Sequence, residues 1–281
     1  MTLNNLNIQT KENVKGDLSK KAILVVSFGT SYNDNREKTI GAIEGAVAAA
    51  YPDYTLRRAF TSRMIINKLK KRDGVQVDNV DEALCHLVME GYGTVIIQPT
   101  HVMNGFEYEE MLGLITPYKG SFSILRIGTP LLTSIEDYTS LAEAILPEIP
   151  EVKQEETAVI LIGHGTDHYA NSAYAALDYR IKDMGYDNIF IGTVEGYPDL
   201  ETVKKLVLAE KSLKKIALYP LMIVAGDHAN NDIAGDEEDS WKSVFEEEGY
   251  EVVCNLKGLG EYAGIRRMFV ERVNNSITSE K

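Results

Sequence analysis

The sequence predicts an α/β protein of two pseudo-duplicated lobes, each a parallel sheet flanked by helices, with a cleft between the lobes. Three observations support this fold class. Apolar runs of strand length alternate with helical patterns, two blocks of sequence recur in both halves, and 281 residues suffice for two lobes with a sizeable core. We expect a polar extension at residues 1–20, an N-terminal lobe at residues 21–130 and a C-terminal lobe at residues 131–281.

Strands are expected where the chain stays apolar over a strand length. These runs lie at residues 21–28, 54–60, 94–99, 122–128, 157–163, 188–194, 214–220 and 250–256. Apolar residues follow one another in these runs instead of alternating with polar ones, which indicates strands buried on both faces. That is typical of parallel sheets covered by helices.

Helices are expected between these strands, since parallel neighbours need a long crossover connection. They are predicted at residues 33–50, 80–91, 199–210 and 239–249, and from about residues 168 and 261 onward. Asp78 is expected to cap the helix over residues 80–91. Strand and helix thus follow one another in both halves.

Two blocks of the first half have counterparts, in the same order, in the second half. The segment VVSFGTSYNDN at residues 25–35 aligns with LIGHGTDHYAN at residues 161–171. The segment IIQPTHVMNGFE at residues 96–107 aligns with ALYPLMIVAGDH at residues 217–228. An internal duplication predicts two similar lobes, and ligands of open α/β sheets bind beyond the carboxyl ends of the strands.

Two histidines, His164 and His228, lie just beyond such strand ends. In the alignment His164 takes the place of Phe28, and His228 takes the place of Glu107. His164 stands between two glycines, which let the chain turn sharply and a ligand approach closely. We therefore expect both histidines to face the cleft, in a site that belongs mainly to the C-terminal lobe.

Carboxylates accompany both histidines. Glu195 follows the strand at residues 188–194 and is a site candidate, although it could instead serve the helix that begins near Pro198. Asp227 and Asp232 lie near His228 in sequence, and either could orient its imidazole ring.

Two imidazoles and one carboxylate from three strand ends suit a divalent first-row metal such as cobalt, nickel, iron or zinc. Calcium and magnesium prefer oxygen ligands alone. Three protein ligands, here His164, Glu195 and His228, would leave coordination positions open for a substrate.

The other histidines and the cysteines carry less information. His168 is expected on the surface or in support of a ligand, and His86 is expected to pack within its helix. His101 follows a strand and could either line the cleft or pack. Cys85 and Cys254 are expected to be buried free thiols.

Composition and missing motifs exclude several classes of function. The net charge of −13 argues against binding to nucleic acid. No apolar run is long enough to span a membrane, and the polar N-terminus does not resemble a secretory signal, so we expect a cytoplasmic protein. The chain lacks the dinucleotide and P-loop fingerprints and the GxSxG elbow, so no nucleotide cofactor is expected.

Several motifs in order, from about Lys21 onward, resemble one known family. They include ILVVSFGTSY, HVMNGFEYE, GHGTDH, VEGYPD and PLMIVAGDHANND. The chain resembles the anaerobic cobalt chelatases, the sirohydrochlorin cobaltochelatases, which are ATP-independent class II chelatases of two α/β lobes. The resemblance implies insertion of cobalt(II), as substrate metal, into sirohydrochlorin.

Matched motif by motif, the resemblance also assigns roles to residues of this chain. His164, Glu195 and His228 would hold the metal, His164 would accept a proton as a catalytic residue, and Glu195 could do the same or relay the proton. Phe28 would contact the tetrapyrrole ring, and we expect Thr30 and His101 beside it in the substrate site. Among basic residues near a strand end, Arg57, Arg58 and Arg63 are candidates to bind the substrate carboxylates, although solvated surface arginines are the preferred interpretation.

Alternatives stay open at this point. The same ligands could insert iron or nickel into a related tetrapyrrole, because affinity alone does not select cobalt. A carrier that never turns over could keep the same ligands. A two-lobed solute-binding protein fits the architecture but gives no role to the three ligands. Whether the protein forms a homo-oligomer also stays open.

Overall fold

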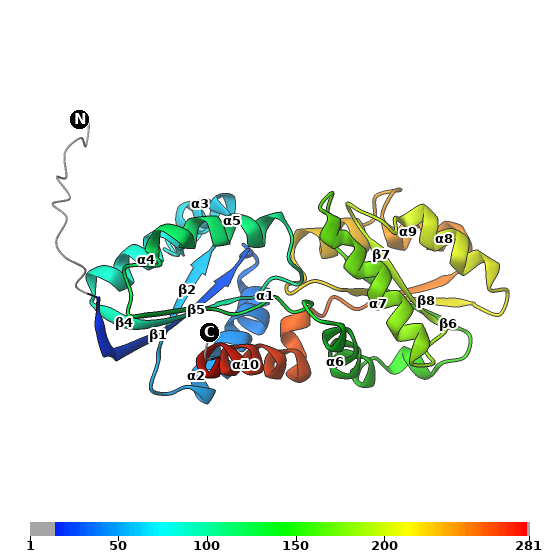
Figure 1. Ribbon diagram of the computed structural model, residues 1–281. Coiled ribbons are helices and arrows are strands. Elements are labelled where there is room, and N and C mark those ends of the chain that lie inside the picture. Colours follow the sequence, from blue (N-terminus) through cyan, green and yellow to red (C-terminus); the bar gives the residue numbers. More distant parts are fainter. Residues whose placement is uncertain (1–14, 280–281) are drawn as a thin grey trace.

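The structure, a computed structural model, describes residues 15–279 (Figure 1). Its N-terminal sheet has five parallel strands in the order β3-β2-β1-β4-β5. They are β1 (Asp17–Ser27), β2 (Thr55–Phe60), β3 (Asp78–Asn79), β4 (Tyr92–Pro99) and β5 (Ile124–Ile127).

The C-terminal sheet has four parallel strands in the order β7-β6-β8-β9. They are β6 (Thr157–Gly163), β7 (Ile189–Thr193), β8 (Lys215–Pro220) and β9 (Glu251–Cys254). In each sheet the first strand (β1 or β6) is central, the next (β2 or β7) lies on one side, and two later strands (β4 and β5, or β8 and β9) lie on the other; β3 extends the N-terminal sheet beyond β2. This shared order agrees with the predicted internal duplication.

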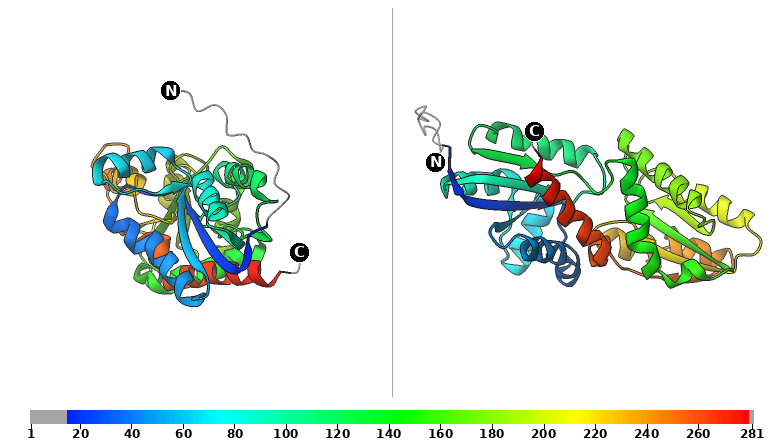
Figure 2. Two further views of the ribbon diagram at one scale, coloured as in Figure 1. Left: turned by 90° about the vertical axis from the view of Figure 1, so that its left-hand side faces the viewer. Right: turned by 60° about the horizontal axis from the view of Figure 1, so that its bottom comes forward.

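Helices cover both faces of each sheet (Figures 1 and 2). The α-helices are α1 (Asn33–Arg36), α2 (Ala42–Ala50), α3 (Arg63–Asp73), α4 (Val80–Met89), α5 (Phe106–Ile115), α6 (Ile135–Ile145), α7 (Ser172–Asp183), α8 (Leu200–Ala209), α9 (Trp241–Glu247) and α10 (Ala263–Thr278). Short helical segments are η1 (Glu37–Gly41), η2 (Thr116–Tyr118), η3 (Leu146–Glu148), η4 (Pro150–Lys153), η5 (Tyr169–Asn171), η6 (Ala229–Ile233) and η7 (Leu259–Glu261). None of the helices between residues 15 and 279 is both long and apolar enough to cross a membrane.

The central strands have two buried faces because successive side chains point to opposite sides. In β1, Ala22, Leu24 and Val26 share a core with residues of α4 and α5, while Ile23 and Val25 share another with residues of α2 and α10. The fold class predicted from continuous apolar runs is confirmed in this way.

All eight predicted strands are present, but three helices, α3, α5 and α6, were not predicted. In α3 only Leu69 is fully buried, and in α5 only Met111 and Ile115 are. Most side chains of α3 are exposed, and the apolar residues of α5 show little helical periodicity, so apolar positions alone identified neither helix. The short strand β3 was also not predicted, because two residues carry no pattern.

The packing departs from the predicted domain division at both ends. The last helix, α10, lies beside α2 on the N-terminal lobe (Figures 1 and 2), where Val273 packs against Ile23 and Val25. Residues 131–281 therefore include a helix that completes the other lobe. At the N-terminus, β1 begins at Asp17, so part of the predicted extension is strand, and the rest lies outside the described residues.

The start of α4 corrects two predictions. Its cap is Asn79, whose side chain accepts the backbone N–H of Glu82, and not Asp78. Asp78 instead accepts a hydrogen bond from His86 Nδ1 at 2.8 Å. His86 is thus an exposed, paired residue on the outer side of the helix and does not pack within the core.

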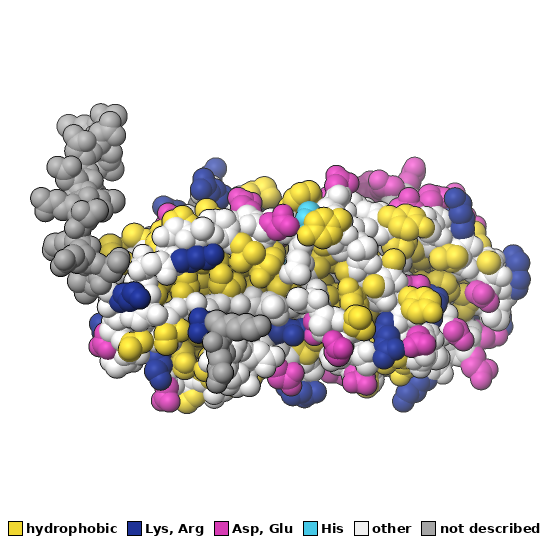
Figure 3. All heavy atoms as spheres, in the orientation of Figure 1, with side chains coloured by type: hydrophobic (Ala, Val, Ile, Leu, Met, Phe, Trp, Pro, Cys, Tyr) yellow, Lys and Arg dark blue, Asp and Glu magenta, His cyan; other side chains and the backbone are white. Residues whose placement is uncertain are grey.

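The cysteines are free, as expected, but Cys85 is exposed and Cys254 is half-buried. The prediction that Cys85 is buried is wrong because it lies on the outer side of α4. Figure 3 shows acidic side chains along the upper edge of the C-terminal lobe.

Candidate metal centre and cleft

His164 follows β6 directly and stands in a tight turn. Gly165 has a φ of +85°, which favours glycine, and a Cβ atom there would lie 2.4 Å from the backbone nitrogen of Gly196. This contact brings the loop after β7 against the loop after β6. The N–H of Glu195 then donates to the carbonyl of His164 at 2.7 Å. The glycine thus sets Glu195 beside the histidine.

The ring of His164 is oriented by its own backbone neighbour. Its Nδ1 atom lies 2.9 Å from the carbonyl oxygen of Gly165. A carbonyl only accepts, so Nδ1 carries the proton and donates. Nε2 therefore keeps its lone pair for a metal or a proton.

His228 stands immediately before η6, in the loop after β8. Its Nδ1 atom lies 2.9 Å from Oδ2 of Asp232, one turn further on. Of the two aspartates considered from sequence, Asp232 is the one that orients the ring. Asp227 instead accepts a hydrogen bond from the Tyr32 hydroxyl of the other lobe at 3.1 Å.

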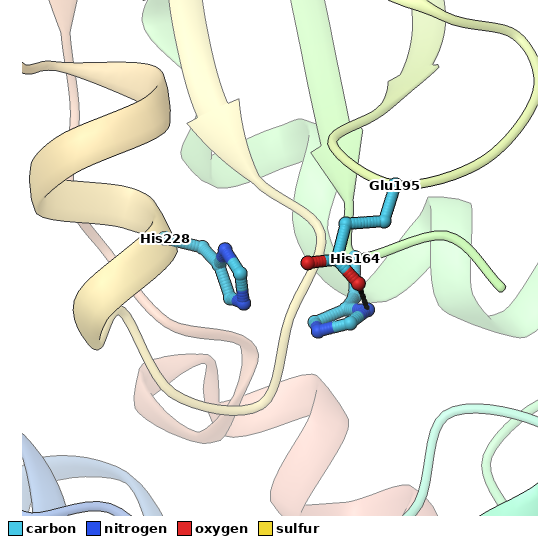
Figure 4. Close-up of side chains that lie close together, drawn as sticks. All are labelled: His164, Glu195 and His228. Carbon is cyan, nitrogen blue, oxygen red and sulfur yellow. Dashed lines mark ion pairs between the residues drawn. The ribbon is translucent and has the colours of Figure 1, made fainter.

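The structure brings His164, Glu195 and His228 together (Figure 4). Each offers one ligand atom, and these atoms all lie within 4.8 Å of one another. The two imidazole rings are 4.5 Å apart and nearly perpendicular, at 85°. Their side chains are 49%, 58% and 32% exposed, so the group is open to an incoming ligand. Two imidazoles and a carboxylate suit a divalent first-row metal.

A cavity of about 620 Å³ lies between the lobes, and His164 and His228 form part of its wall. Four large apolar or aromatic side chains of the N-terminal lobe line it and stay exposed: Phe28, Tyr32, Met64 and Phe106. Monomers rarely leave several such side chains exposed around one cleft without a ligand to cover them. The cavity therefore suits a large, largely apolar ligand next to the metal ligands.

The predicted substrate contacts all line this cavity, but they differ in access. Phe28 is exposed, whereas Thr30 is buried and its hydroxyl accepts the N–H of Tyr32. His101 lies deeper, and neither ring nitrogen has a hydrogen-bond partner among the described residues. Burial lowers the pKa of His101 to about 4, so its ring is neutral near pH 7.

Glu107 is a cavity residue that sequence analysis did not propose for the site. It lines the wall 3.8 Å from His101 Nε2. Partial desolvation raises the pKa of its carboxyl group, and the neighbouring His164 opposes that rise. Its alignment with His228 was the signal that could have identified it.

His168 is neither a surface residue nor a support for a metal ligand, and both predictions are corrected. Its side chain is only 5% exposed. Its Nδ1 atom accepts the N–H of Ala170, its ring packs 4.6 Å from that of Phe106, and its Nε2 lies 3.4 Å from Glu109. Phe106 and Glu109 belong to α5, so His168 joins the two lobes.

The three arginines suspected of binding carboxylates do not line the cavity. Arg57 is paired with Glu90, and Arg58 makes two hydrogen bonds to Glu44. Arg63 is exposed at the start of α3. A residue's nearness to a strand end does not show whether its charge is already neutralised.

Two similar α/β lobes, with an open set of two histidines and a glutamate at an apolar cleft, define a protein that can hold a first-row metal beside a bulky ligand. A family model described as cobalt chelatase (CbiK) matches residues 21–278. The chain belongs to this cobalt chelatase family.

The individual relatives agree. The chain is 43% identical over 258 residues to a sirohydrochlorin cobaltochelatase of Salmonella typhimurium, covering 92% of this chain and 97% of the relative. It is 30% identical to sirohydrochlorin cobaltochelatase CbiKC of Nitratidesulfovibrio vulgaris, covering 93% and 92%. The solved structure of SirB from Bacillus subtilis with Fe³⁺ shares the fold, with a TM-score of 0.61 at 15% identity over 92% of this chain and 96% of that one.

Proposed function

We propose that this protein inserts cobalt(II) into sirohydrochlorin without ATP. The observation that carries the proposal is the convergence of His164, Glu195 and His228, whose two histidines form part of the wall of an apolar cleft. Family membership supports it, and so does the similarity to the two sirohydrochlorin cobaltochelatases described above.

The reaction requires the metal to lose its water and the ring to lose two pyrrole protons. We assign the role of proton acceptor to His164, whose Nε2 has a free lone pair. When Nε2 takes a proton, the new charge is shared with an Nδ1–H that already donates to Gly165. The carboxylate of Glu195, 3.8 Å from Nδ1, stabilises that charge and accepts the second pyrrole proton or relays it to solvent.

Glu195 and His228 would hold the cobalt ion while it exchanges water for pyrrole nitrogens. Ligands of two kinds from separate loops can be released one at a time. Asp232 keeps the Nδ1 proton of His228 in place, so Nε2 of that ring stays the metal-binding atom.

The tetrapyrrole would lie against the wall that the N-terminal lobe contributes. Phe28 offers an exposed ring for stacking, at the position that His164 holds in the other lobe. Thr30 and His101 would shape the wall behind it. A ring held bent between the lobes turns its nitrogen lone pairs toward the metal.

We further propose that the protein works in the cytoplasm, since two free thiols, one of them exposed, fit a reducing compartment. A homo-oligomer stays a prediction, and light scattering on the purified protein would check it.

The test is anaerobic: purified protein, sirohydrochlorin and cobalt(II), followed by the absorbance change of the tetrapyrrole. The control is His164→Ala, which should lose insertion while it still binds tetrapyrrole. Insertion by the wild type no faster than without protein would contradict the proposal. Parallel reactions with iron(II) and nickel(II) test for a different metal preference. A carrier would show no turnover with any metal, and the His164→Ala protein would simply bind its ligand more weakly.

A further inference from the structure

The cavity wall contains a single lysine or arginine side chain among its described lining residues, and this is Lys68. It lies on α3, where Met64, Ile65 and Lys68 all line the cavity. Positions one turn apart on a helix share a face, so this face of α3 points at the cleft. The helix presents an apolar side chain and a cation side by side.

The charge of Lys68 is not used by the protein itself. The side chain is exposed, and no described carboxylate lies within ion-pair distance of it. Its neighbour one turn on, Arg72, pairs with Asp73 and also donates to the carbonyl of Ser31. Among the described lining residues of the cavity, Lys68 is therefore the cation that stays available to a ligand.

The surroundings of Lys68 are otherwise unfavourable to an anion. The chain has a net charge of −13, and the cavity wall also contains the carboxylates of Glu107 and Asp227. Sirohydrochlorin, the substrate in the proposed function on which this inference rests, carries many carboxylates. Such a ligand meets repulsion from these two carboxylates and attraction at Lys68.

We propose that Lys68 binds a carboxylate of the tetrapyrrole and so fixes which edge of the macrocycle faces α3. The apolar ring would then contact Met64 and Phe28, which are exposed in the same cavity. Lys68 touches the periphery of the substrate and not the reacting nitrogens. Its loss should weaken substrate binding and leave the chemical step nearly unchanged.

The test compares Lys68→Ala, Lys68→Glu and Lys68→Arg with a matched control, Lys70→Ala. Lys70 is exposed on the same helix but does not line the cavity. An ion pair at a partly exposed site leads us to expect a rise of about fivefold in the KM for sirohydrochlorin in Lys68→Ala, with kcat within about twofold. Lys68→Glu should raise KM further, Lys68→Arg should stay near the wild type, and Lys70→Ala should have no effect.

A second measurement separates this inference from the proposed function. Metal-free sirohydrochlorin and its fully methylated ester are titrated into each variant, at low and at high salt. The free acid should bind Lys68→Ala more weakly than the wild type, with a smaller dependence on salt, and the ester should not distinguish the two proteins.

The outcomes are distinct. If the wild type inserts cobalt but Lys68→Ala and Lys68→Glu keep the KM and binding of Lys70→Ala, the role of Lys68 is wrong and the function stands. If the wild type binds sirohydrochlorin through Lys68 but never inserts a metal, the proposed function is wrong and the carboxylate site stands.

Discussion

At the scale of single residues, the orientation of His228 depends on one carboxylate. Asp232 accepts from its Nδ1 atom at 2.9 Å and so holds the ring with Nε2 toward His164. Replacing Asp232 by alanine should weaken cobalt(II) binding about tenfold or more, since such supporting partners contribute 10- to 100-fold in metal sites. Titration with cobalt(II), followed by its visible absorption, measures this. Asp239→Ala, an exposed aspartate further along the same segment, is the control, and equal affinities would contradict the role of Asp232.

A second residue gives a pH-dependent stability. Burial lowers the pKa of His101 from 6.5 to about 4, so the folded state resists protonation of this ring. Near pH 7 the ring is neutral in both states and contributes nothing. Below about pH 6.5 the unfolded chain takes up a proton that the folded chain refuses until about pH 4, which costs up to about 3 kcal/mol of stability. Denaturant unfolding of His101→Gln should therefore show a smaller loss between pH 7 and pH 4 than the wild type. If the two proteins lose the same stability between pH 7 and pH 4, the lowered pKa of His101 is not the cause.

Residues at strand ends could be predicted better than residues on helices. His164, Glu195 and His228 were proposed from sequence because each follows an apolar strand, and the structure brings them together. Glu107 and Lys68 were missed because they lie on α5 and α3, two helices that were not predicted from sequence. Whether a charge such as that of Arg58 is already paired depends on a partner that only the fold supplies.

At the scale of elements, the metal centre depends on the close approach of the loops after β6 and β7. A methyl group at Gly165 would lie 2.4 Å from Gly196 N and would push away the loop that carries Glu195. Gly165→Ala should therefore lower metal affinity and insertion by tenfold or more, in addition to the roughly 1–2 kcal/mol for an alanine at positive φ.

A second glycine offers a matched control for that variant. Gly185 has a φ of +90°, close to the +85° of Gly165, but a Cβ atom there meets nothing within 4 Å. Gly185→Ala should lose similar stability to backbone strain and keep full metal affinity. Thermal unfolding and cobalt titration of both variants separate strain from displacement of Glu195, and a Gly165→Ala protein with normal affinity would refute the argument.

The same elements show why the strands were easier to predict than the helices that pack on them. A continuous apolar run such as β6 identifies a strand buried on both faces from sequence alone. Which helix covers each face is decided by tertiary packing, since an amphipathic stripe fits any apolar surface of suitable shape. The sequence therefore predicted a helix near residue 261 without indicating that it returns to the first lobe.

At the scale of the whole molecule, α10 packs the C-terminal end of the described chain against the N-terminal sheet. It leaves the C-terminal lobe and covers the N-terminal sheet, where Val273 is buried against Ile23 and Val25 (Figure 2). The N-terminal lobe is thus incomplete without α10. Val273→Ala should lower the free energy of unfolding by about 2 kcal/mol, from lost burial and the cavity left behind. Asn274→Ala, the exposed neighbour on the same helix, should change it by less than about 0.5 kcal/mol. Urea unfolding measures both, and equal midpoints would show that α10 does not stabilise the N-terminal lobe.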